Sequence, residues 1–223
     1  YCVVPEQFLF KLPEHLNLEE GELLENAANA VAAVRKAELK PREKIVVIGT
    51  SAIGMLGLQI ARLWSPSKLI MVGADSQHLE LALNLGASHT VEEGSEDPVA
   101  GLMDLLDGYG ADAILVCASD QFAMELAMRI VGSQGRIVVE GHYAPSAEVK
   151  FSPFDLLVDR SVTICANRGW LTKDYVKAME LVSDSIIDAR NLITHRFTLN
   201  QWDSAFDLYE KNDDHVIQVA IKP

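Results

Sequence analysis

Residues 44–61, KIVVIGTSAIGMLGLQIA, join a short apolar run to a helix-patterned run through a glycine-containing loop. The run from Lys44 to Gly49 is typical of a strand buried on both faces. Gly49, Ser51 and Gly54 occupy the three positions of the G-x-G-x-x-G pattern, which permits a tight turn, a close approach of pyrophosphate and close helix packing. The loop therefore predicts an anion site at a helix N-terminus. Its expected residues are Gly49, Ser51, Ala52, Ile53 and Gly54.

Strand and helix patterns alternate on the C-terminal side of this loop. Further strands are expected at residues 68–72, 88–92, 111–117, 136–141 and 162–167, with helices between them. A helix over about residues 20–37 precedes the alternation. This order predicts an α/β fold with a doubly wound parallel sheet of the Rossmann type. After about residue 185 the rhythm changes, and a strand, an amphipathic helix and a closing strand are expected to belong to a second domain that is mostly missing.

The composition excludes several classes of partner. The chain has 32 acidic and 19 basic residues, and the resulting charge of −13 repels nucleic acid and anionic lipid. No apolar run is as long as a membrane span, and no signal-peptide pattern begins the chain. Cys2, Cys117 and Cys165 are far apart and form no CxxC pair, which favours reduced thiols in a cytoplasmic protein. Because the chain opens on Tyr1 rather than Met, we expect it to be a piece of a longer protein.

The end of the second strand bears on the choice of dinucleotide. An acidic residue that binds an adenosine ribose is expected here, and Gly73 falls at its usual place with Asp75 just beyond it. Glycine tolerates a 2′-phosphate, but no Arg follows to bind that phosphate and Asp75 would repel it. The balance predicts NAD, with NADP possible, and places Gly73, Asp75 and His78 near the cofactor. Asp75 is equally suited to cap the next helix.

Together these pieces make the chain similar, along its whole length, to the medium-chain dehydrogenase/reductase family, in its zinc-type alcohol, sorbitol and threonine dehydrogenase branch. The matching segments are YCVVPEQFLFKLPEHLNLEEGELLE (1–25), GTSAIGMLGLQIAR (49–62), HLELALNLGA (78–87) and ITHRF (193–197). The resemblance implies hydride transfer between NAD(P) and an alcohol or polyol, with zinc in the intact parent. It also implies three parts: 1–37, a remnant of the catalytic domain with a crossover helix; 38–185, the dinucleotide-binding domain; and 186–223, a return to the catalytic domain.

The family's N-terminal GroES-like domain has no counterpart in this sequence, and that domain carries most zinc ligands and the proton-relaying hydroxyl. We therefore expect no catalytic residue here and no activity from this chain alone. Glu25, in LLENAANAV, matches the family's L-x-E-P-L segment, whose acid can approach the zinc, with Asn26 in place of the proline. A single carboxylate makes no metal site. The plainer interpretation is an acid that interacts with a helix N-terminus.

The resemblance further implies that the loops after the fourth, fifth and sixth strands border the cofactor. Their candidate residues are Ala118, Ser119, Gly141, His142, Asn167 and Arg168. Arg168 stands at a strand end on the ligand side of an open α/β sheet, whereas His142 can equally be an exposed loop histidine. The chain departs from the family at Cys117, at Asp120 and at Ser51, whose Cβ would crowd a pyrophosphate although its hydroxyl could donate to it. His195 and Arg196 are interpreted as packing and surface residues.

Two alternatives to a zinc-dependent parent remain open: a non-catalytic Rossmann module for ligand sensing or subunit assembly, and a zinc-free quinone-reductase-like enzyme. In relatives the sixth strands pair across a two-fold axis, which implies a homodimer or homotetramer. Residues 162–167 contain no Pro, no Lys and no run of charge that would protect an edge strand. The same segment is therefore the expected interface.

Overall fold

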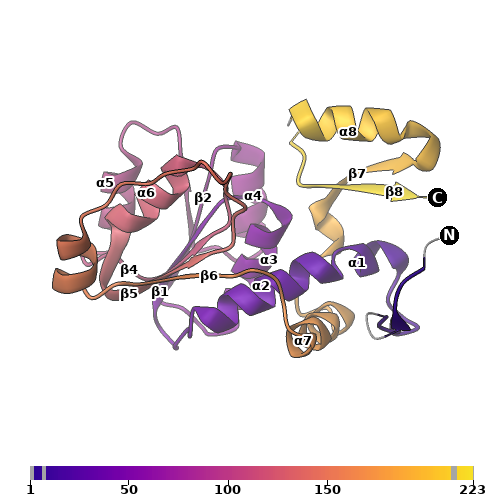
Figure 1. Ribbon diagram of the computed structural model, residues 1–223, viewed down its shortest axis with the longest axis horizontal. Coiled ribbons are helices and arrows are strands. Elements are labelled where there is room, and N and C mark those ends of the chain that lie inside the picture. Colours follow the sequence, from indigo (N-terminus) through magenta and orange to yellow (C-terminus); the bar gives the residue numbers. More distant parts are fainter. Residues whose placement is uncertain (1–2, 7–8, 212–214, 223) are drawn as a thin grey trace.

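The computed structural model describes residues 3–6, 9–211 and 215–222, and its main feature is a six-stranded parallel sheet. Within those residues the strands are β1 (Lys44–Ile48), β2 (Lys68–Gly73), β3 (His89–Glu92), β4 (Ala111–Val116), β5 (Val131–Val139) and β6 (Thr163–Ala166). Their order is β3-β2-β1-β4-β5-β6, so the chain runs outward from β1 in two directions (Figure 1). This order confirms the doubly wound fold expected from the alternation of strands and helices.

Helices cover both faces of this sheet. α2 (Leu24–Lys36), α3 (Ala52–Arg62), α4 (Ser76–Asn84) and α7 (Thr172–Ser183) share one core with alternate residues of β1, β2 and β4. α5 (Pro98–Leu105) and α6 (Gln121–Ile130) share the second core with the intervening strand residues. Ile45 and Val47 face the first core, and Val46 and Ile48 face the second, so the apolar run at 44–48 is buried on both sides.

Most strand ends lie within two residues of the sequence prediction, and two larger differences remain. The helix expected over 20–37 is divided at Leu23, because a capping box formed by Asn17 and Glu20 starts the separate short helix α1 (Leu18–Glu22). β5 begins at Val131 rather than 136, since Val131 already pairs with Ala111 before a break in register. The intervening residues include Gln134 at φ +58° and show no apolar alternation, which is why periodicity placed the strand start too late.

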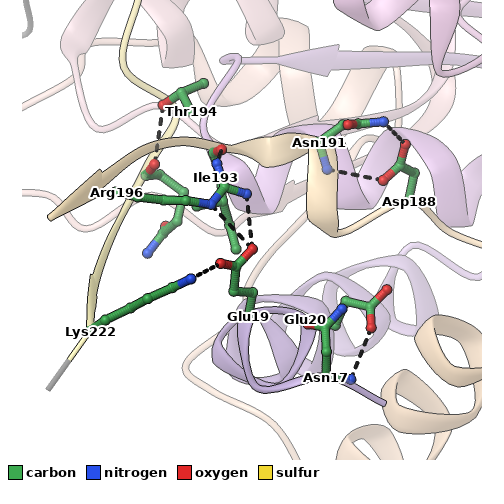
Figure 2. A network of polar contacts seen from close by, with 10 residues as sticks. Asn17, Glu19, Glu20, Asp188, Asn191, Ile193, Thr194, Arg196 and Lys222 are labelled. Atoms are coloured by element: carbon green, nitrogen blue, oxygen red, sulfur yellow. Dashed lines mark hydrogen bonds and ion pairs between the residues drawn. The ribbon is translucent and has the colours of Figure 1, made fainter. Parts of the chain in front are cut away.

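The C-terminal part forms a second, smaller unit. β7 (Ile193–Thr198) and β8 (Gln218–Lys222) pair in parallel, and η4 (Leu199–Gln201) and α8 (Trp202–Lys211) lie between them in sequence. Figure 2 shows Glu19 of α1 bound to both strands, with Arg196 Nη2 3.0 Å from its Oε2 and Lys222 as a further ion-pair partner. The unit is thereby joined to the N-terminal helices (Figure 1). The domain boundaries after 37 and 185 stay predictions.

Short helices complete the fold: η2 (Phe154–Asp159), a π-helix before β6, and η3 (Arg190–Leu192), a 3₁₀ turn before β7. None of the helices in the described part of the chain has the length and apolar content needed to cross a bilayer. Cys117 and Cys165 carry free thiols, and Cys2 lies outside the described residues.

Candidate functional site

The loop between β1 and α3 depends on two glycines. Gly49 has φ +106°, and a Cβ at this position would lie 2.8 Å from the backbone nitrogen of Ala118. A Cβ on Gly54 would lie only 2.0 Å from the carbonyl oxygen of Gly49. Both distances are too short for a real Cβ atom, so neither position tolerates a side chain. The loop is therefore folded tightly against the end of β4 and presents the N-terminus of α3 at the carboxyl edge of the sheet.

Ser51 is the N-cap of α3. Its Oγ accepts a hydrogen bond from the Gly54 N–H at 3.3 Å and donates one to the carbonyl of Cys117, also at 3.3 Å. The single hydroxyl proton is thus used within the chain rather than offered to a phosphate. Ala52 and Ile53 open the helix, and the first N–H groups of a helix have no intrahelical acceptor. Their backbone N–H groups are the remaining donors for an anion.

Asp75 follows β2 and caps α4, so the capping alternative describes the observed local structure. Its Oδ1 accepts from the backbone N–H groups of Gln77 at 2.8 Å and His78 at 3.0 Å. Its Oδ2 lies 2.5 Å from Nδ1 of His215, a residue 140 positions away. Burial raises the pKa of the Asp75 carboxyl, but these hydrogen bonds outweigh burial and leave the pKa below its ordinary value. Ribose binding by Asp75 stays a prediction.

A cavity of about 380 Å³ lies between the glycine loop and the C-terminal unit. It is lined by Thr50, Ser51, Ala74, Asp75, His78, Tyr209, His215, Val216 and Ile217. Gly73 stands beside it, and a Cβ there would meet Thr50 Cγ2 at 2.4 Å. Packing therefore requires a glycine at position 73. The sequence analysis had selected Gly73 for a different reason, the absence of a charged side chain.

The loops after β4 and β5 are in direct contact. A Cβ on Gly141 would lie 2.0 Å from the carbonyl oxygen of Ala118, and the His142 N–H donates to Ser119 Oγ at 2.9 Å. The structure thus brings together four of the residues that the resemblance selected. The His142 side chain is exposed, in agreement with its plainer interpretation as a loop histidine. Arg168, after β6, is exposed as well.

Glu140 is a residue of this edge that the sequence analysis did not select. Its side chain is 4% exposed, and its Oε2 accepts a hydrogen bond from Asn167 Nδ2 at 2.5 Å. The same amide donates to the carbonyl of Asn29 in α2 at 3.2 Å. Burial raises the pKa of Glu140 to about 7, opposed by the Asn167 hydrogen bond and the charge of Lys36. The sequence did hold a signal for Glu140, since an acidic residue closes the otherwise apolar run IVVE.

Two buried polar atoms at this edge lack partners in the described part of the chain: Asn167 Oδ1 and the Tyr143 hydroxyl. Burial raises the pKa of the Tyr143 phenol, and the charge of Asp120 adds to that effect. A buried polar atom without a hydrogen bond is costly, which is consistent with a bound molecule that supplies the missing partners. Together with the glycine loop between β1 and α3, these atoms fit a dinucleotide that lies along the carboxyl ends of the strands.

The residues that the structure describes do not fit a zinc site. Glu25 lies exposed in the first turn of α2, where the helix dipole favours an acid. Among residues 3–6, 9–211 and 215–222, no three or more His, Cys, Asp or Glu side chains are grouped so as to hold a metal ion. A catalytic zinc needs about three protein ligands.

Comparison with known proteins gives a family match and several close folds. The zinc-binding dehydrogenase family matches residues 52–184. Sorbitol dehydrogenase of Halalkalibacterium halodurans is 24% identical over 224 residues, which cover all of this chain and 64% of that protein.

Two solved structures superpose with a TM-score of 0.91. One is an Escherichia coli oxidoreductase/dehydrogenase of unknown specificity, 26% identical, with 98% of this chain and 62% of that chain covered. The other is a candidate zinc-binding dehydrogenase of Sinorhizobium meliloti bound to NADP, 23% identical, with 99% and 64% covered. The chain thus spans less than two-thirds of the length of these proteins.

Proposed function

Because the chain belongs to the zinc-binding dehydrogenase family, we propose that it is the dinucleotide-binding part of an NAD(P)-dependent dehydrogenase of alcohols or polyols. The observation that carries the proposal is the glycine loop, which presents the N-terminus of α3 at the carboxyl edge between β1 and β4. Ligands of doubly wound sheets bind at this position. The sorbitol dehydrogenase among the relatives supports a polyol substrate.

The chain's own residues bind and orient the dinucleotide. The N–H groups of Ala52 and Ile53 would bind the pyrophosphate, and the loops after β4, β5 and β6 would hold the nicotinamide. Asn167 Oδ1, buried without a partner in the described residues, would accept from a donor on that end of the cofactor. When bound, nicotinamide supplies hydride exchange with a carbinol carbon. We favour NAD, because a 2′-phosphate beside Asp75 would lose on the order of 1 kcal/mol at a solvated site.

Zinc, a homodimeric or homotetrameric assembly and a cytoplasmic location are proposals for the whole protein. Glu25 is the one metal candidate that the resemblance places in this chain, and no step is assigned to it. We expect the 223-residue chain to have no dehydrogenase activity by itself. Turnover of a polyol by the purified chain, or one tightly bound zinc per chain, would contradict this expectation.

Isothermal titration with NADH and NADPH tests the dinucleotide site. We expect weak binding that is lost in Gly54→Trp, because that position has no room for a side chain. A folded protein that gives no heat with either dinucleotide at millimolar concentration would refute the proposal. Such a result would favour the alternative, a non-catalytic Rossmann module. That alternative is supported by the hydrogen bonds that already engage Ser51 and Asp75 within the chain.

A further inference from the structure

The C-terminal unit contributes a histidine to the cavity beside the glycine loop. His215 precedes β8, and its Nδ1 lies 2.5 Å from Oδ2 of Asp75. Its backbone carbonyl lies 2.9 Å from Nε2 of His78, whose Nδ1 is 3.1 Å from Thr50 Oγ1. The network therefore connects the glycine loop, the N-terminus of α4 and the C-terminal unit around one cavity.

These partners fix where the protons lie. The His215 carbonyl can only accept, so Nε2 of His78 carries a hydrogen, and in the neutral ring Nδ1 accepts from the Thr50 hydroxyl. The Asp75 carboxylate can only accept, so Nδ1 of His215 carries a hydrogen in both charge states. Any second hydrogen bond from the His215 ring must therefore come from Nε2. That atom accepts when the ring is neutral and donates when the ring is protonated.

We propose that His215 is the residue that sets the preference between NAD and NADP, because it contacts the 2′ substituent of the adenosine ribose in this cavity. The inference rests on the proposed dinucleotide-binding function. A neutral ring accepts from a 2′-hydroxyl, while Asp75 repels a 2′-phosphate. A protonated ring neutralises Asp75 and donates to a 2′-phosphate. The same site thus favours NAD when the ring is neutral and admits NADP when the ring is protonated.

Among the described residues, few charged side chains line this cavity. Among the described residues that line the cavity, the titratable side chains besides His215 are Asp75, His78 and Tyr209. The rings of His78 and His215 are 6.4 Å apart. Asp213 and Asp214 precede His215 in the sequence and lie outside the described residues. No Lys or Arg is among the described residues that line the cavity, so a protonated histidine is the cation that this lining can offer to a 2′-phosphate.

The test is the ratio of the dissociation constants of NADPH and NADH, measured by titration calorimetry at pH 5.5 and 8.5. The 2′-phosphate itself takes up a proton near pH 6, so each variant is compared with the wild type at the same pH. His215→Gln keeps a polar side chain without the charge change. His89→Gln is the matched control, since His89 is the first residue of β3, whereas the cavity lies beyond the carboxyl ends of β1 and β2, and its Nδ1 lies 2.9 Å from Ser88 Oγ.

We expect His215→Gln to raise the ratio about fivefold at pH 5.5 and to change it less than twofold at pH 8.5, with His89→Gln equal to the wild type. A His215→Gln ratio equal to the wild-type ratio at both pH values would overturn the inference and leave the proposed function intact. No binding of either dinucleotide to the folded wild type would refute both.

Discussion

Replacing Glu140 by glutamine removes a buried carboxyl whose ionisation opposes folding. The side chain is 4% exposed, and its pKa is raised from 4.5 to about 7 by burial. Below pH 4.5 both the folded and the unfolded chain hold this proton, so the group is neutral in each state. Between these two values the folded chain holds more protons, and its stability therefore falls as the pH rises. Above pH 7 the folded chain buries a charged carboxylate, and the loss of unfolding free energy reaches its full size.

The size of the effect follows from the pKa difference. Each unit corresponds to about 1.4 kcal/mol, so a shift from 4.5 to about 7 amounts to about 3 kcal/mol. Glutamine has almost the same volume, accepts the same hydrogen bond from Asn167 and carries no charge at any pH. Relative to the wild type, Glu140→Gln should thus gain about 3 kcal/mol of unfolding free energy between pH 4.5 and pH 8.

Urea unfolding followed by circular dichroism at pH 4.5, 6, 7 and 8 measures this difference. Glu148→Gln serves as the control, because it makes the same substitution at a carboxyl that is exposed rather than buried. A constant difference between Glu140→Gln and the wild type across this range would refute the argument, because it would mean that Glu140 ionises equally in both states. A difference that grows toward acid pH would show that the predicted pH dependence has the wrong sign.

Three further outcomes are expected. Gly54→Ala should lower the unfolding free energy by about 1–3 kcal/mol in thermal or urea unfolding, because its Cβ would overlap a carbonyl oxygen 2.0 Å away. Asp174→Ala should cost about 2 kcal/mol in the same assays, since it removes a carboxylate 2% exposed that binds Arg35 Nε at 2.8 Å. Ile164→Pro should convert a dimer to a monomer in light scattering at tens of micromolar, because β6 is an edge strand.

Each of these outcomes has a control. Gly101→Ala, where a Cβ meets nothing within 4 Å, should stabilise the chain by up to about 1 kcal/mol, and an equal loss at both glycines would contradict the steric argument. Lys177→Ala breaks an exposed ion pair and should cost less than about 0.5 kcal/mol. For the β6 interface, Thr163→Lys is a second variant that places a charge on the same edge strand without the backbone effect of a proline. An unchanged dimer in both folded β6 variants, or a monomeric wild type, would exclude this interface.

The sequence alone determined the sheet and its glycine loop. Residues 44–48 form an apolar run because β1 lies at the centre of the sheet and is covered on both faces. The glycines recur because backbone atoms approach them too closely for a side chain, as Gly54 shows. Such requirements act on consecutive or regularly spaced residues, and periodicity therefore records them. The start of β5 was missed for the same reason, since Val131 pairs across a stretch without alternation.

The partners of the charged groups were decided only by the tertiary structure. Asp75 carried signals for a helix cap and for a ribose ligand, yet the atom at its second oxygen belongs to His215, 140 residues away. Glu140 meets Asn167 across 27 residues because β5 and β6 end side by side. No local pattern encodes such pairs: they depend on which strands are neighbours and on where the C-terminal unit packs. The pKa of a buried acid depends on those same surroundings, and is therefore set only once the chain has folded.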